Sequence, residues 1–238
     1  MLYDLFYIGG VYSENKKDYY MNVSKHGYQF AAQDLHESLI NGFLQNGIDL
    51  TVLSIPSLST FPKGNKLAFV QDDKFLYNGK CLGKSFGFIN VPFLNQPSKK
   101  KIADFVEKWY HSSDRRKSIF VYSLNITMME IAVRAKKKHP DIQLCIITPD
   151  LPRFMGCNRY YKMLGLQKKD INAIYSLIPL FECYVVLSKN MIYDLGISDR
   201  PHVVMEGICA YNPTFELAHY EKNVHKVILY TGNIGRKY

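Results

Sequence analysis

The sequence predicts an α/β protein built on a doubly wound, mostly parallel sheet with helices on both faces. Short apolar runs typical of strands alternate along the chain with amphipathic segments typical of helices. The first strand, helix and second strand also follow one another in the order of a right-handed βαβ unit, whose two strands are parallel. With 238 residues, 47% of them hydrophobic, the chain is long enough to bury a full core.

The predicted βαβ unit occupies the first 54 residues. Residues 2–8 are an apolar, β-rich run that stops at Gly9-Gly10, and a polar stretch without a predicted element follows. Apolar residues recur on one helical face over 29–46, and Asn46-Gly47 ends that helix. Residues 48–54 predict the second strand.

The later elements follow in a regular order. Residues 56–83 are expected to be loop with possible short strands, and 86–91 to be the third strand, ended by Pro92. Further helices are predicted from Ser98 toward His111 and at 126–138, 169–176 and 190–195, with strands at 118–122, 143–148, 183–187 and 202–205. In such sheets the ligand crevice lies beyond the carboxyl ends of the strands.

Charge and composition limit the function classes. Thirty Lys and Arg against 21 Asp and Glu give a net charge of +9, which favours an anionic partner such as lipid headgroups or a phosphorylated substrate. Nucleic acid is disfavoured because no recognised binding motif accompanies the charge. The five cysteines form no CxxC pair or zinc-type spacing, so we expect buried thiols in a reducing compartment and no metal site. No apolar run approaches the roughly 18 to 20 residues of a membrane span, and a cytoplasmic protein is expected.

Two segments look like ligand sites at first sight. Residues 79–85 resemble a phosphate-binding loop but have three residues between the glycines where that motif needs four, so we reject a nucleoside-triphosphate loop. The segment 153–164 mixes aromatic and cationic side chains, which suits contact with an acceptor or an anionic membrane surface. Its candidates are Arg153, Arg159, Tyr160, Tyr161 and Lys162. An ordinary packed helix with basic exposed positions is the alternative.

The order of several short motifs carries a resemblance. These are Gly9-Gly10 after the first strand, the helix and strand of 31–54, and the segments 147–152, 186–191 and 203–208, followed by a strand and glycine loop at 226–238. Together they resemble the amino-terminal half of a bacterial glycosyltransferase of family 4, the retaining group with the two-domain GT-B fold. The resemblance implies a Rossmann-like acceptor-binding domain over 1–224 and the start of a donor-binding domain at 225–238.

The resemblance also implies an activity. Such an enzyme transfers a sugar from a nucleotide-diphosphate sugar to a lipid-linked or polysaccharide acceptor, without a cofactor or metal, on the inner face of the cytoplasmic membrane. The family's donor domain carries two glutamates seven residues apart, whereas Glu216 and Glu221 have another spacing. We therefore expect the donor domain outside this chain, on a longer polypeptide or a partner chain, and expect this half alone to be inactive.

Site residues follow from the same resemblance. Gly9 and Gly10 match the glycine turn that faces the donor phosphates, although a simple turn is the alternative. Asp150 is the candidate catalytic residue, with Thr148-Pro149 before it where relatives carry a histidine, and a turn aspartate is its simpler interpretation. Asn125 and Lys189, which follow neighbouring strands, are candidate acceptor contacts.

Two other functions stay open. A non-catalytic Rossmann-like module could recruit an acceptor or a partner chain. A different small-molecule enzyme could use the same sheet, because a fold does not fix chemistry.

Overall fold

The computed structural model describes residues 3–25, 30–77, 79–92, 94–154, 162–163 and 165–208. The strands are β1 (Tyr3–Gly9), β2 (Asp49–Ser54), β3 (Phe69–Val70), β4 (Asp73–Tyr77), β5 (Cys81–Ser85), β6 (Phe88–Ile89), β7 (Arg116–Tyr122), β8 (Gln143–Thr148), β9 (Cys183–Val186) and β10 (His202–Val204). The helices are α1 (Lys17–Val23), α2 (Phe30–Gln45), α3 (Lys99–Tyr110), α4 (Ile126–Lys138), α6 (Leu166–Leu177) and α7 (Asn190–Leu195), with short 3-10 helices η1 (Glu14–Lys16), η2 (Pro152–Phe154) and η3 (Ile178–Leu180).

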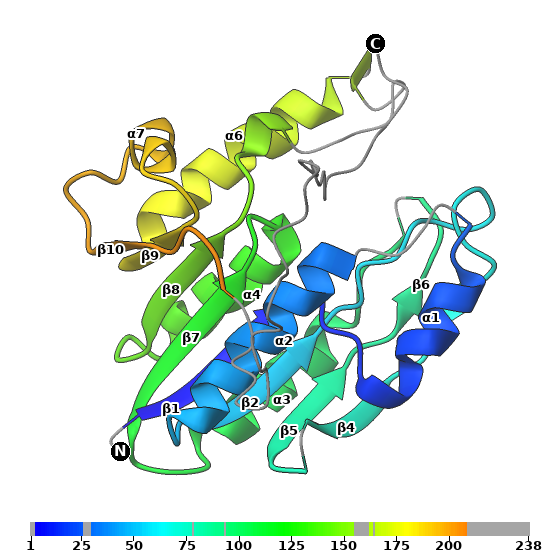
Figure 1. Ribbon diagram of the computed structural model, residues 1–238, viewed down its shortest axis with the longest axis horizontal. Coiled ribbons are helices and arrows are strands. Elements are labelled where there is room, and N and C mark those ends of the chain that lie inside the picture. Colours follow the sequence, from blue (N-terminus) through cyan, green and yellow to red (C-terminus); the bar gives the residue numbers. More distant parts are fainter. Residues whose placement is uncertain are drawn as a thin grey trace, which may run out of the picture.

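Within the described residues, the main sheet has eight strands in the order β10-β9-β8-β7-β1-β2-β5-β4 (Figure 1). All neighbouring strands in it are parallel except β4, which pairs antiparallel with β5 at one edge. After β1, the strands β2, β5 and β4 lie on one side of it. The later strands β7, β8, β9 and β10 lie in that order on its other side. The order therefore reverses between β1 and β7, and the predicted α/β class with a mostly parallel, Rossmann-like sheet is confirmed.

Helices cover both faces of this sheet (Figure 1). On one face Phe6 and Ile8 of β1 join a core with apolar side chains of α3, α4, α6 and α7. On the other face Leu5 and Tyr7 of the same strand pack with α2. Consecutive β1 residues thus point to opposite faces, as a strand requires. None of the helices in the described ranges combines the length and apolar character that crossing a membrane requires.

The prediction that residues 86–91 form the third strand of the main sheet was wrong. The third parallel strand is β5, whereas Phe88–Ile89 pairs antiparallel with Phe69–Val70 in a separate two-stranded sheet. The sequence of β5, Cys-Leu-Gly-Lys-Ser, has too few large apolar residues for its pattern to indicate a buried strand. Because β5 occupies this segment after a turn at Gly79, the rejection of a phosphate-binding loop agrees with the structure.

The polar stretch after Gly10 also contains η1 and α1, which the sequence did not predict. Of the seven residues of α1 only Tyr20 is buried, so the helix has no continuous apolar face to detect. The predicted helix and strand at 126–138 and 143–148 have the bounds of α4 and β8. The proposed domain start at 225–238 lies outside the described residues.

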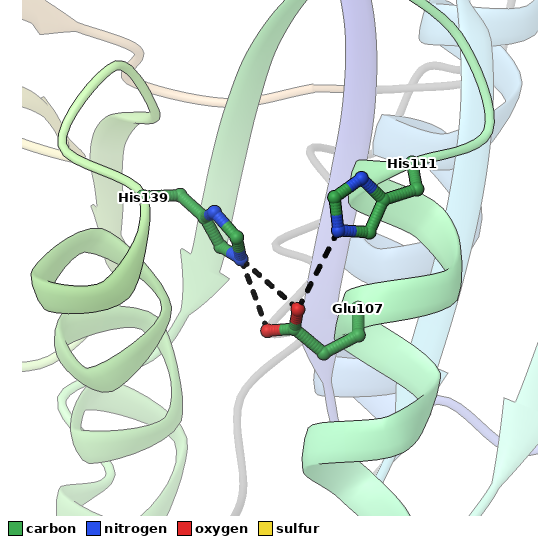
Figure 2. Close-up of side chains that lie close together, drawn as sticks. All are labelled: Glu107, His111 and His139. Atoms are coloured by element: carbon green, nitrogen blue, oxygen red, sulfur yellow. Dashed lines mark hydrogen bonds and ion pairs between the residues drawn. The ribbon is translucent and has the colours of Figure 1, made fainter.

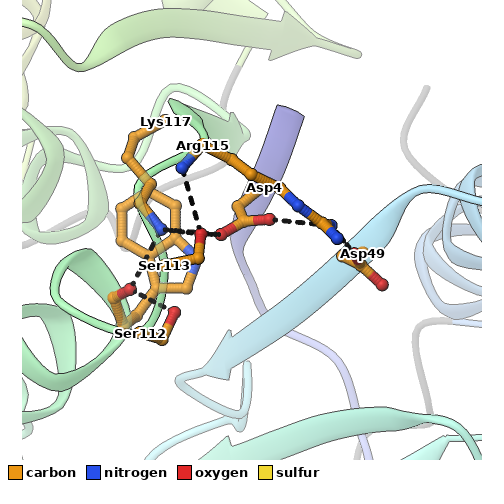
Figure 3. A network of polar contacts seen from close by, with 7 residues as sticks. Asp4, Asp49, Ser112, Ser113, Arg115 and Lys117 are labelled. Carbon is orange, nitrogen blue, oxygen red and sulfur yellow. Dashed lines mark hydrogen bonds and ion pairs between the residues drawn. The ribbon is translucent and has the colours of Figure 1, made fainter. Parts of the chain in front are cut away.

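A buried ion pair joins β1 to β7 near their amino ends (Figure 3). The Lys117 ammonium donates to the Asp4 carboxylate at 2.6 Å, and the two side chains are only 2% and 9% exposed. Ser113 donates to the same carboxylate, and Arg115 pairs with both Asp4 and Asp49. Burial raises the pKa of Asp4, but the hydrogen bonds and charges of Lys117, Ser113 and Arg115 outweigh it and hold the pKa below its usual value. The carboxylate is therefore charged at neutral pH and fully partnered.

We expect Lys117→Met to lower the free energy of unfolding by about 3 to 5 kcal/mol, because it leaves the Asp4 charge buried without its partner. The double variant Asp4→Leu/Lys117→Met should recover most of that loss. Arg115→Gln is the matched control, since an exposed ion pair contributes at most about 1 kcal/mol. Urea unfolding of the four proteins measures these differences, and equal losses for Lys117→Met and Arg115→Gln would contradict the assignment.

Candidate functional site

A small cavity lies where β1 and β7 end, at the point where the strand order reverses. Its volume is about 90 Å³. The polar residues that line it are Tyr12, Gln33, His36, Ser57, Tyr122, Ser123 and Asn125. They come from the end of β7, from the connections after β1, β2 and β7, and from the first turns of α2. In doubly wound sheets this reversal point is the usual position of a ligand crevice, so the cavity is the candidate functional site.

The two glycines after the first strand have different neighbours. A Cβ built on Gly9 would lie 2.7 Å from Cε1 of His36, and one on Gly10 would lie 3.3 Å from Cβ of Ser57. Close packing of α2 against the end of β1 therefore requires a glycine at position 9. Gly10 instead lines the cavity, where any added side chain would take up space.

Hydrogen bonds fix the cavity wall. The Gln33 side chain accepts from the Tyr12 backbone N–H at 3.0 Å and donates to the Tyr12 carbonyl at 3.3 Å. The Tyr12 hydroxyl donates to the carbonyl of Ser57, and the Ser54 hydroxyl donates to the carbonyl of Val11. The connections after β1 and β2 are thus tied to each other and to α2.

The described lining of the cavity mixes polar and apolar surface and carries no charged side chain. Burial lowers the pKa of His36 to about 3, so its imidazole is neutral at physiological pH. Its Nδ1 lies 2.6 Å from the hydroxyl of Tyr7, which is fully buried. Burial, with a contribution from the charge of Asp150, raises the pKa of Tyr122 to about 12. No Asp, Glu, Lys or Arg is among the described residues that line this cavity.

The structure brings two of the predicted site residues, Gly10 and Asn125, to the cavity. Asn125 caps α4, where its side chain accepts from the Met128 N–H at 3.2 Å. Asp150 is exposed after β8, outside the lining but close enough for its charge to act on Tyr122. Lys189 is exposed at the start of α7 and does not line the cavity.

The aromatic and basic segment is only partly described. Arg153 forms an ion pair with Asp194 of α7 at 2.9 Å, and its guanidinium lies 4.8 Å from the ring centre of Phe154. Lys162 is exposed. Three other predicted contacts, Arg159, Tyr160 and Tyr161, lie outside the described residues.

Most of the residues that line the cavity were not predicted from the sequence. Gln33 and His36 are polar residues one turn apart within a helix that was identified by its apolar face, and both are buried. Their burial depends on how α2 packs against β1, so the sequence pattern alone does not mark them as site residues. Tyr122 lies at the end of an apolar strand, and nothing in that pattern separates it from a core residue.

Acid should destabilise the protein through His36. The unfolded chain takes up this proton at about pH 6.5, whereas the folded protein takes it up only near pH 3. Stability from this residue is thus complete above the unfolded value and falls with acidification, by about 2 kcal/mol between about pH 7 and pH 5. Urea unfolding of wild type and His36→Gln at both pH values tests this. The variant should lose less stability on acidification, and an equal loss in both proteins would contradict the prediction.

Comparison with models of known protein families gives no match to this chain, and comparison with curated protein sequences gives none either. The proposed function therefore rests on the fold and on the side chains that line the cavity. They point to a partly buried site at the strand reversal, lined in part by amide, hydroxyl and imidazole groups.

Proposed function

We propose that this chain is the acceptor-binding, Rossmann-like domain of a retaining glycosyltransferase of the GT-B type. In this proposal the cavity at the end of β1 and β7 receives a hydroxyl-bearing part of a sugar acceptor. The observation that carries the proposal is the uncharged, hydrogen-bonding lining of a cavity at the strand reversal. The order of sequence motifs supports it independently.

The chemistry of the lining suits a neutral, hydroxyl-rich ligand. The amide group of Asn125 and the hydroxyl groups of Ser57 and Ser123 can both donate to and accept from sugar hydroxyls. The amide of Gln33 is already bonded to Tyr12 and Glu37, so it shapes the cavity wall. The rings of Tyr12 and Tyr122 add apolar surface of the kind that lines small-molecule sites. A phosphate or carboxylate ligand would instead favour arginine or lysine.

The volume of the cavity limits the size of the ligand that it can hold. Ligand pockets usually measure about 300 to 1,000 Å³, and this cavity is about 90 Å³. We infer that it holds one end of an acceptor whose remainder lies along the carboxyl edge of the sheet. We propose that Asp150 orients the acceptor hydroxyl. Its carboxylate is exposed after β8, and its charge contributes to the raised pKa of Tyr122 in the cavity wall. The nucleotide-diphosphate sugar would be held mainly by residues other than those of this cavity.

The test is an NMR titration of the ¹⁵N-labelled chain with a panel of methyl glycosides, namely glucoside, galactoside, mannoside and N-acetylglucosaminide. We expect shifts of the backbone amides around Gly10, Ser57 and Asn125 with at least one of them. Gly10→Ala, which adds a methyl group facing Ser57, should weaken binding at least about tenfold, equivalent to about 1.4 kcal/mol.

Gly42→Ala is the matched control, because a Cβ at Gly42 on α2 meets no atom within 4 Å. It should leave the titration unchanged. Shifts that map to another surface, or equal weakening by both alanine variants, would contradict the cavity as the acceptor site. If no glycoside binds at millimolar concentration, the non-catalytic module that recruits a partner chain replaces the proposal.

A further inference from the structure

Among the described residues, three side chains of metal-binding type, Glu107, His111 and His139, lie close together (Figure 2). They lie at the ends of α3 and α4 that lead into β7 and β8, whereas the cavity lies where β1 and β7 end. Glu107 and His111 lie one turn apart near the end of α3, and His139 is the C-cap residue of α4. Nε2 of His139 lies 3.0 and 3.2 Å from the two carboxylate oxygens of Glu107, and Nε2 of His111 lies 3.8 Å from the nearer one. One donor atom from each residue falls within 4.8 Å of the other two.

The fold holds these donors in place. Residues four apart share one face of a helix, and here that face of α3 is turned toward the end of α4 (Figure 2). His139 is 12% exposed, and its ring stacks on that of Tyr110 with centres 3.7 Å apart. The Tyr110 hydroxyl in turn donates to Asp141 at 2.9 Å. The best-buried ligand is thus oriented by a second layer of contacts, as in many metal sites.

We propose that Glu107, His111 and His139 bind a divalent transition-metal ion, with Zn²⁺ the best match and water completing the coordination. Two imidazoles and one carboxylate are a known zinc ligand set, with bonds of about 2.0 to 2.2 Å. Donors on a tetrahedron of that size lie about 3.3 Å apart. The observed separations of 3.0 to 3.8 Å from Glu107 therefore need only small movements, and the exposed His111 can turn to close the third side.

Lys138 is the competitor for this site. Its ammonium lies 2.9 Å from Glu107, and its side chain is 63% exposed, so it can turn to solvent when a metal ion binds. Burial raises the pKa of Glu107, but the Lys138 and His139 contacts outweigh it and lower the pKa, so the ligand is already a carboxylate. An ion-pair cluster without metal is the rival explanation, and the two differ in how they respond to Zn²⁺.

A bound ion would cross-link two helices. It would fasten the end of α3 to the end of α4, two helices packed on the same face of the sheet. Because it binds the folded state through two separate helices, it should raise the melting temperature, by an amount that grows with the logarithm of the free Zn²⁺ concentration above the dissociation constant. This site is independent of the proposed acceptor cavity, so either proposal can fail without the other.

The test is calorimetric titration of the whole chain with Zn²⁺, together with visible absorption of the Co²⁺ form. We expect one ion per chain, a d–d absorption band of Co²⁺ held by nitrogen and oxygen donors, and a rise in melting temperature with Zn²⁺. His111→Ala and Glu107→Gln should each weaken binding at least about tenfold. Lys138→Gln should strengthen it, because the competing cation is gone.

His202→Ala is the matched control. His202 is an exposed histidine on the edge strand β10, and its removal should leave the affinity unchanged. A sulfur-to-cobalt charge-transfer band would place the ion on cysteine and overturn the proposal. So would an absence of saturable Zn²⁺ binding in wild type and Lys138→Gln, since the three residues would then form only an ion-pair cluster.

Discussion

The register between β1 and β7 is the constraint on which the rest of the structure depends, and the buried pair of Asp4 and Lys117 holds it. These two residues pair across the two parallel strands between which the strand order of the sheet reverses. A slip of one residue would turn every side chain of β1 to the opposite face of the sheet, and it would leave two charges buried without partners. At the other end of the same strands, this register brings the turn at Gly10 next to Asn125, and the cavity forms between them.

The carboxyl ends and the amino ends of the parallel strands differ in electrostatics. At the carboxyl edge burial keeps His36 neutral, and the lining offers only uncharged hydrogen-bonding groups. At the amino ends of the strands, Asp4 and Glu107 stay charged. The hydrogen bonds and charges of their partners lower the pKa of each carboxyl group more than burial raises it. This difference underlies our two proposals, a hydroxyl-rich acceptor at the carboxyl ends and a metal cation near the amino ends.

Much of the fold could be predicted from the sequence where local signals agree. α4 has an Asn cap, an apolar face and lysines at its end, and its bounds were predicted to the residue. β5 and α1 were missed because their stability comes from neighbouring strands and a single buried tyrosine rather than from a periodic pattern. At the cavity, Gly10 and Asn125 could be predicted because strand ends meet there. Gln33 and His36 could not, because only the packing of α2 on β1 brings them to that edge.

The most direct measurement is sugar transfer by the endogenous polypeptide that contains this sequence, purified from its source cells and supplied with nucleotide-diphosphate sugars and saccharide acceptors. We predict transfer with retained anomeric configuration. We also predict that Ser57→Leu, which fills the cavity, raises KM for the acceptor while leaving KM for the donor unchanged. Transfer that is unaffected by filling the cavity, or purified polypeptide that transfers no sugar to any acceptor, would contradict the assignment of the crevice as the acceptor site.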